Sequence, residues 1–326
     1  MARTQLGKLP GARKAALPGF IAPQLATLVN EPPSGSQWLH ELKFDGYRML
    51  CRIDGGKVQF WSRNGNDWTA KFLNLVDEVR TLPVKTAIID GEIVVEDTKG
   101  HASFQSLQRA LGNSVKAQFL FHVFDLIYLD GFNLTATPLR ERKRVLMEVC
   151  KSANSRGRIQ YSDHVEGNGE AFFKRACSYG IEGIVSKLAD SLYESTRNKN
   201  WLKIKCNKQQ EFVIAGHTPS AKGLPGFGSL ILSVYQDGTL IYAGRVGTGF
   251  SLKQRVELRK KLDKLTRKTS PFAHTPKDPG LREAQWVEPK LVAAITFTEW
   301  TSDGSIRHPS FQGLREDKSP REVVRE

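Results

Sequence analysis

The chain has 326 residues, 48 Lys and Arg against 34 Asp and Glu, a formal net charge of +14 and a hydrophobic fraction of 40%. This length exceeds the size at which one hydrophobic core usually stops growing, so two domains are expected. The positive charge favours a polyanionic partner such as nucleic acid, although a solvated lysine-rich surface produces the same excess. Because no stretch approaches the roughly 18 apolar residues of a membrane span, we expect a soluble, cytoplasmic protein that does not contact a membrane.

Residues 1–18 are basic and contain no acid. Arg3, Lys8, Arg13 and Lys14 lie in this segment, which predicts either a flexible arm that contacts phosphates or a frayed tail.

From residue 19 to 208 the pattern alternates between strands and helices. Apolar residues alternating with polar ones around WLHELKF, MLCRI and VQFW predict a meander of strands, with Lys43 at or just after one of them. The runs AIIDGEIVV and FLFHVFDLIYL predict buried strands, and helices are expected after Asp67 and Ser103 and over 140–153 and 169–179. This mixture indicates an α+β domain with antiparallel sheets.

After Lys208 the sequence pattern changes to short strands separated by glycine turns, which predicts a small β-barrel over residues 209–326. One helix, from Ser251 to about Arg267, is expected within it. The stretch 251–270 contains eight Lys or Arg and is a candidate phosphate-contacting surface, although a solvated helix face is an equal alternative.

The four cysteines are Cys51, Cys150, Cys177 and Cys206. They are widely separated and form no C-x-x-C pair, which argues against a zinc site and against a disulfide framework. A reducing cytosol is the compartment that this pattern favours.

Four short motifs place ionisable side chains beside turns or on strands: KFDGYR from Lys43, DGE from Asp90, EGIVSK from Glu182 and WLKIK from Trp201. Acids within or beside an apolar strand are costly unless they are paired or bind a metal. Alternate lysines on a strand point to one face. Taken singly, the first motif is explained by a surface turn and the last by an exposed edge. Together they supply an amine, cations for phosphates and acids for a metal, which nucleotidyl transfer to lysine requires.

The segments KFDGYR, SRNG, DGE, FDLIYLDG, EGIVSK and WLKIK occur in the order of the motifs of the covalent nucleotidyltransferases, and from about Ala15 to the C-terminus the chain resembles the ATP-dependent DNA ligases. It is most similar to the ligase domain of bacterial ligase D, the non-homologous end-joining enzyme, through phrases such as WLHELKFDGYRML, RVGTGF and RHPSFQGLREDK. The resemblance implies an ATP-grasp-like nucleotidyltransferase domain followed by an OB-fold domain.

The resemblance also implies which residues activate ATP. Lys43 would attack the α-phosphorus as a free amine, so we expect its pKa to be depressed by Arg48, Lys203, Lys205 and a nearby metal. The last two lysines would also stabilise negative charge that develops at the α-phosphate.

The metal and the nucleoside have their own expected ligands. Mg²⁺, or Mn²⁺, would be bound by Glu182, with Asp45 as a weaker candidate. The remaining nucleotide contacts fall to Glu41 at the adenine amino group, Arg48 and Glu92 at the ribose, and Phe124 stacked on the base opposite Val185. For Phe124 and Val185 a plain core role is the alternative.

Three further residues are expected to contact phosphates. Arg63 would hold the 5′-phosphate of DNA, whereas Arg307 and Lys318 match a C-terminal motif that closes over the β and γ phosphates of ATP. His308, beside a proline, is expected to be structural.

The implied function is an ATP-dependent DNA ligase that seals 5′-phosphate/3′-hydroxyl nicks through a lysyl-AMP and a DNA-adenylate. Nicked duplex DNA is the expected substrate, a Ku-type end-binding protein a possible partner, and a nucleoid-associated monomer the expected form. The alternatives are an RNA ligase, a capping-type nucleotidyltransferase, and a DNA-binding adaptor that has lost catalysis.

Overall fold

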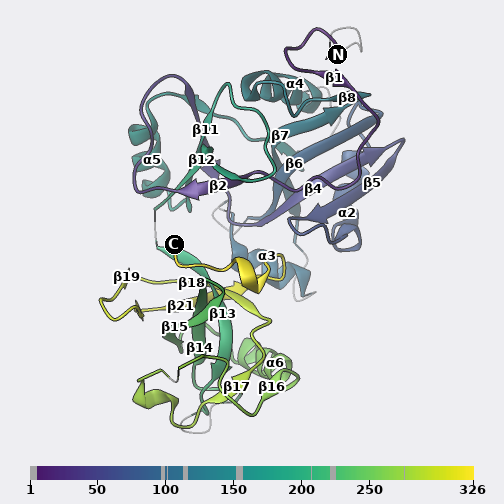
Figure 1. The fold of residues 1–326 in the computed structure, drawn as a ribbon. Coiled ribbons are helices and arrows are strands. Elements are labelled where there is room, and N and C mark those ends of the chain that lie inside the picture. Colours follow the sequence, from purple (N-terminus) through teal and green to yellow (C-terminus); the bar gives the residue numbers. More distant parts are fainter. Residues whose placement is uncertain are drawn as a thin grey trace. The chain divides into compact units, whose positions relative to one another are not determined.

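The computed structural model describes residues 6–96, 100, 102–112, 117–151, 157–206, 208–220, 225–274 and 276–326. The chain divides into two compact units, Met1–Cys206 and Asn207–Glu326, each of which is drawn in Figure 1. The division lies close to the boundary that the sequence suggests at Lys208. Within the described ranges, no helix combines the length and the apolar character needed to cross a membrane.

The larger sheet of the first unit consists of β1 (Arg13–Lys14), β4 (Tyr47–Asp54), β5 (Lys57–Ser62), β6 (Thr86–Val95), β7 (Phe119–Leu129), β8 (Phe132–Asn133) and β9 (Ile159–Tyr161). The order is β1-β8-β7-β6-β4-β5, and β9 pairs in parallel with β7. The two apolar runs of the sequence form the central strands β6 and β7, which are buried along most of their length. Helices pack against this sheet: α2 (Leu73–Val79), preceded by η1 (Thr69–Lys71), α3 (Phe104–Leu111) and α4 (Leu139–Lys151).

The second sheet of this unit contains β2 (Leu25–Leu28), β3 (Trp38–Lys43), β10 (Val165–Glu166), β11 (Gly183–Leu188) and β12 (Arg197–Lys205), in the order β10-β3-β11-β12-β2. Helix α5 (Gly169–Ser178) packs against β3 and β11, and Figure 1 shows it beside this sheet. Leu42, Ile184 and Ile204 form an apolar cluster with Ala176 of the helix. One face of the sheet is thereby covered, and side chains at the alternate positions lie on the opposite face.

The second unit is a β domain built from β13 (Gln209–His217), β14 (Leu230–Gln236), β15 (Thr239–Val246), β16 (Thr266–Arg267), β17 (Gln285–Val287), β18 (Val292–Thr296) and β21 (Ser310–Leu314), with a separate pair β19 (Glu299–Trp300) and β20 (Ile306–Arg307). Strand β13 pairs with β14, β17 and β18, around a core of its own. The unit also contains α6 (Leu252–Asp263), η3 (Pro279–Leu281) and η4 (Pro320–Glu322).

Helix α6 begins as predicted but ends earlier than expected. Ser251 and Gln254 form a capping box at its start, whereas Thr266 and Arg267, predicted to be helical, pair with Val287 and Trp286 as β16. One of its basic residues, Arg255, also stabilises the fold, because it donates hydrogen bonds to the carbonyls of Phe227, Gly228 and Gly247.

The prediction of a flexible basic arm over residues 1–18 is wrong for the part that the structure describes. Leu6 and Leu9 are buried, which anchors the segment by apolar contact. Arg13 and Lys14 pair with β8, and the Tyr128 hydroxyl donates a hydrogen bond to the carbonyl of Ala15. Arg3 lies outside the described residues.

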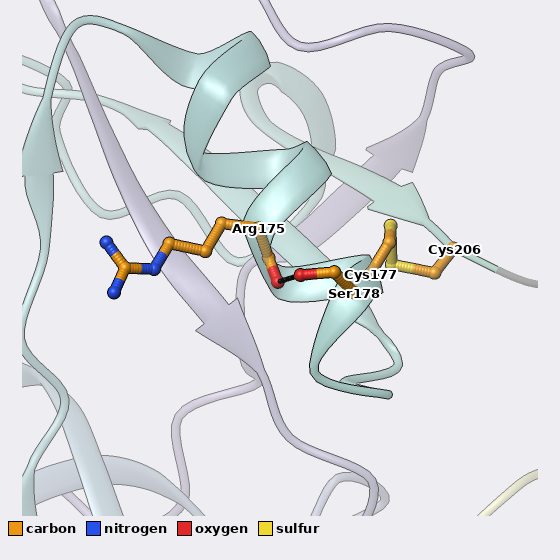
Figure 2. The surroundings of a disulfide bond; sticks show 4 residues. All are labelled: Arg175, Cys177, Ser178 and Cys206. Atoms are coloured by element: carbon orange, nitrogen blue, oxygen red, sulfur yellow. Dashed lines mark hydrogen bonds between the residues drawn. A yellow bond between two sulfur atoms is a disulfide. The ribbon is translucent and has the colours of Figure 1, made fainter.

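The expectation that the cysteines form no disulfide is also wrong. Cys177, near the end of α5, is bonded to Cys206, which follows β12, and their Cα atoms lie 5.3 Å apart (Figure 2). The sequence separation of 29 residues conceals this contact, because it arises only when β12 pairs antiparallel with β11 and ends beside Gly183, close after α5. Cys51 and Cys150 are free thiols.

We predict that the double variant Cys177→Ser/Cys206→Ser unfolds at a lower temperature than wild type. Closing a loop of this length restricts the unfolded chain, and the loss corresponds to about 3 to 4 kcal/mol at most. Thermal unfolding without reductant measures the effect. Cys150→Ser is the control, and a double variant as stable as this control would contradict the prediction.

Candidate active site

The register of β3, β11 and β12 places the predicted catalytic residues in two adjacent rows. Lys43 lies opposite Gly183, and Gly183 opposite Lys205. In the neighbouring row, Val185 lies between Glu41 and Lys203. Directly opposed residues of antiparallel strands share a face, and alternate residues along a strand do so as well. Both rows therefore lie on the face of the sheet opposite α5.

Gly183 lies between Lys43 and Lys205 in the first row and contributes no side chain there. A Cβ atom at this position would lie 2.0 Å from the carbonyl oxygen of Ile204, so no larger residue fits without moving the backbone. The absence of a side chain also leaves the space between Lys43 and Lys205 unfilled from this strand. The glycine of the EGIVSK motif is thus needed for the close approach of β11 to β12.

Lys43 is paired with Glu182, the residue just before β11. Its Nζ lies 2.5 Å from Glu182 Oε2, and the two side chains are 22% and 11% exposed. Burial acts to lower the pKa of Lys43, but the charge and hydrogen bond of Glu182, helped by Asp45 and Glu92, outweigh it and raise the pKa. The expected depression of this pKa is therefore not found in the protein alone, because the nearest charge is an acid.

Arg48 is fixed by the buried carboxylate of Asp90. Its Nε and Nη2 donate to the two oxygens at 2.9 and 2.6 Å, and Nη1 donates to the carbonyl of Gln24. The Tyr193 hydroxyl completes the set with a 2.7 Å bond to Asp90. Burial acts to lower the pKa of Arg48, and Asp90 more than reverses this. Asp90, the first acid of the DGE motif, is thus paired with a cation. Glu92, the second acid, lies opposite Arg48 in the register of β4 and β6.

Glu41 belongs to a buried ionic cluster. Its carboxylate forms ion pairs with Lys143 of α4 at 2.8 Å and with Lys187 of β11 at 2.9 Å, and it accepts a hydrogen bond from Ser162. Burial acts to raise the pKa of Glu41, but the two ammonium groups lower it overall. The carboxylate is therefore an anion whose contacts within the protein are to these groups, and its contact with adenine stays a prediction.

Two cations, Lys187 and Arg48, lie near the ring of Phe124 of β7. Lys187 Nζ is 4.2 Å from the centre of its ring, and the Arg48 guanidinium carbon is 5.4 Å away. Trp201 packs edge-on against Phe124, with ring centres 6.1 Å apart. Phe124 and Val185 are only partly buried, so neither is a wholly enclosed core residue.

The other predicted phosphate ligands belong to other parts of the chain. Arg63 lies in the turn after β5, which is closed by a bond from the Gly65 amide to the Ser62 carbonyl. Arg307 and Lys318 belong to the second unit, where they pair with Glu299 at 3.0 Å and Glu211 at 3.3 Å.

Sequence reasoning missed three buried residues that pair with the predicted ones. Tyr193 and Lys143 lie in segments without a motif and carried no local signal. Lys187 ends the EGIVSK motif two positions after Val185, so the alternation of a strand was available to place it on the same face.

Comparison with known proteins identifies the family. The ATP dependent DNA ligase domain matches residues 23–205, which is more than half of the chain, and the ATP dependent DNA ligase C terminal region matches residues 224–318. The chain belongs to the ATP-dependent DNA ligase family. The predicted architecture of a nucleotidyltransferase domain followed by an OB-fold domain is confirmed for this ligase.

The resemblance to ligase D is confirmed as well. The ligase is 37% identical over 316 residues to the multifunctional non-homologous end joining protein LigD of Pseudomonas aeruginosa, a match that covers 96% of this chain and 37% of that protein. It thus spans well under half the length of that relative.

Solved structures agree with this assignment. A mycobacterial DNA ligase D complexed with ATP and MES is similar with a TM-score of 0.69 and 34% identity, covering 94% of this chain and 98% of that one. The ligase domain of LigD from M. tuberculosis is similar with a TM-score of 0.52 and 35% identity over the same shares of the two chains.

We predict that Gly183→Ala destabilises the ligase and disrupts the row of Lys43 and Lys205. The added methyl group has to displace the carbonyl of Ile204, and overpacking of this kind costs about 1 to 3 kcal/mol. Gly19→Ala, which meets no atom within 4 Å, is the control. Thermal unfolding and the rate of adenylyl transfer to the protein check the result, and equal behaviour of the two variants would contradict it.

Proposed function

We propose that this ligase seals nicks in duplex DNA through a covalent adenylate on Lys43. The observation that carries the proposal is the position of this amine: it lies at the end of β3, in ionic contact with Glu182 and in one row with Lys205. A lysine amine beside a second cation and an acid is suited to attack a phosphate, provided that it loses its proton.

The proposed reaction has three steps, and each step forms one bond and breaks another. The Nζ of Lys43 attacks the α-phosphorus of ATP, and the bond to pyrophosphate breaks. An oxygen of the 5′-phosphate of DNA then attacks the same phosphorus, and the phosphorus–nitrogen bond breaks to give a DNA-adenylate. Attack of the 3′-hydroxyl on the 5′-phosphate forms the phosphodiester and releases AMP. We assign stabilisation of the α-phosphate to Lys203 and Lys205, and recognition of the 5′-phosphate to Arg63.

The residues present are compatible with Mg²⁺, or Mn²⁺, as the metal. Among the described residues, no group of three or more His, Cys, Asp or Glu side chains is arranged to hold an ion. Mg²⁺ is usually bound by one or two carboxylates together with water and substrate phosphates, so Glu182 and Asp45 fit this pattern. A cation held there would supply charge that offsets the influence of Glu182 on Lys43.

We retain the predicted nucleotide contacts as part of the proposal. Phe124 and Val185, both partly exposed, are assigned to the base, and Glu41 to the adenine amino group. The ribose is assigned to Arg48 and Glu92, and the β and γ phosphates to Arg307 and Lys318.

We further propose that the ligase acts in end joining, as the names of its LigD relatives suggest for those proteins. A Ku-type end-binding protein would recruit it, and a monomer bound to the nucleoid in the cytoplasm would be the working form. The net charge of +14 supports an association with DNA.

We predict that Lys43→Met abolishes adenylyl transfer to the protein. With radiolabelled ATP and Mg²⁺, wild type should acquire an acid-labile adenylate and seal nicked DNA, whereas the variant should do neither, because no other amine occupies its position. Lys57→Met, at an exposed position of β5, is the control. Labelling from GTP, or sealing of RNA in preference to DNA, would contradict the proposal.

We predict that a Ku-type protein increases the sealing of broken ends more than the sealing of a pre-formed nick. Recruitment raises the local concentration of enzyme at broken ends, which no intact opposite strand holds together. Sealing of both substrates with and without the partner provides the measurement. An equal effect on both would remove the support for recruitment.

A further inference from the structure

We propose that Lys187 is a positioning residue for nucleotide binding, which fixes the Phe124 ring that we assign to the base. This inference rests on the proposed function, because it takes Phe124 as the base platform. It concerns a side chain that has no role in the reaction steps described above.

Lys187 is directed toward the site by the strand that carries Val185. It lies opposite Leu39 of β3 and Trp201 of β12, on the same face as Val185, and is 2% exposed. A buried ammonium group is costly to desolvate unless it has partners. The groups that contact the ammonium of Lys187 therefore indicate its role.

Its contacts join the two sheets of the first unit. Nζ lies 2.9 Å from Glu41 Oε2, 4.2 Å from the ring centre of Phe124 and 4.3 Å from that of Trp201. Phe124 belongs to the larger sheet, whereas Glu41, Lys187 and Trp201 belong to the smaller one. The cation thus holds a ring of one sheet against the strands that carry Lys43 and Val185 on the other.

The strength of this contact comes from burial. A cation on an aromatic face contributes more when it is desolvated than at an exposed site, and the ammonium group of Lys187 is buried. Phe124 is partly exposed, so its orientation is not fixed by enclosure alone. Loss of the cation leaves Arg48, at 5.4 Å, as the other charged group over the ring.

The charge of Lys187 is set by its surroundings. Burial lowers its pKa to about 8, opposed by the charges of Glu41 and Asp125 and assisted by that of Lys143. These groups come from β3, β7 and α4, and Arg48 of β4 approaches the same two rings. Because the pKa is lowered, the ammonium form is present below about pH 8 and is lost above it. The contact with Phe124 should weaken over the same range.

Binding of the non-reactive analogue α,β-methylene-ATP with Mg²⁺, measured by calorimetry, tests the proposal without requiring adenylyl transfer. In Lys187→Met the dissociation constant should rise about tenfold, the change expected when a buried cation–π contact is removed. In wild type it should also rise between about pH 7 and about pH 9, as the ammonium loses its proton. Lys187→Arg should retain affinity and lose this part of the pH dependence, because a guanidinium stays charged.

Lys143→Met is the matched control. Lys143 pairs with the same carboxylate at 2.8 Å, and its ring contact is with Tyr161. Its loss should lower thermal stability but change the dissociation constant by less than about threefold, since no contact to the base platform is removed. Equal rises for both methionine variants would locate the effect at Glu41 and overturn the proposal, as would wild-type affinity in Lys187→Met or no binding by wild type. If wild type binds the analogue but forms no lysyl adenylate from ATP, the proposed function fails while this result stands.

Discussion

The register between β3, β11 and β12 is the constraint on which the active site depends. The motifs that supply Lys43, Gly183 and Lys205 are more than a hundred residues apart at their extremes, and only strand pairing makes them neighbours. Because side chains alternate along a strand, a slip of one residue would turn the charged row toward the apolar cluster beneath α5. Leu42, Ile184 and Ile204 would then lose their packing against α5, so this packing fixes which face of the sheet carries the charged residues.

Buried charge is the second feature of the first unit. Arg48 with Asp90, and Glu41 with its two lysines, are ion pairs taken out of water, in which the loss of a partner leaves charge less well compensated. The nucleoside contacts that we propose thus lie on a framework of buried charged groups.

The sequence predicted the order of elements and the family because these depend on local patterns and on motifs. It predicted Lys43 at a strand end and the alternate placement of Lys203 and Lys205, which follow from a period of two residues. It failed where a property depends on distant neighbours. The raised pKa of Lys43 arises from Glu182, which lies 139 residues further along the chain. The bond between Cys177 and Cys206 depends on the pairing of β11 with β12, which brings Cys206 back toward α5.

The position of Cys206 also affects how the first unit responds to mechanical load. This residue is the last of the unit, and its amide donates a hydrogen bond to the carbonyl of Glu182. Any pull exerted on the chain beyond it is taken up by the sulfur bridge and passed to α5, rather than peeling β12 away from β11. Lys205, one residue before, is therefore shielded from strain in the connection to the second unit, so its position opposite Gly183 can stay constant under load.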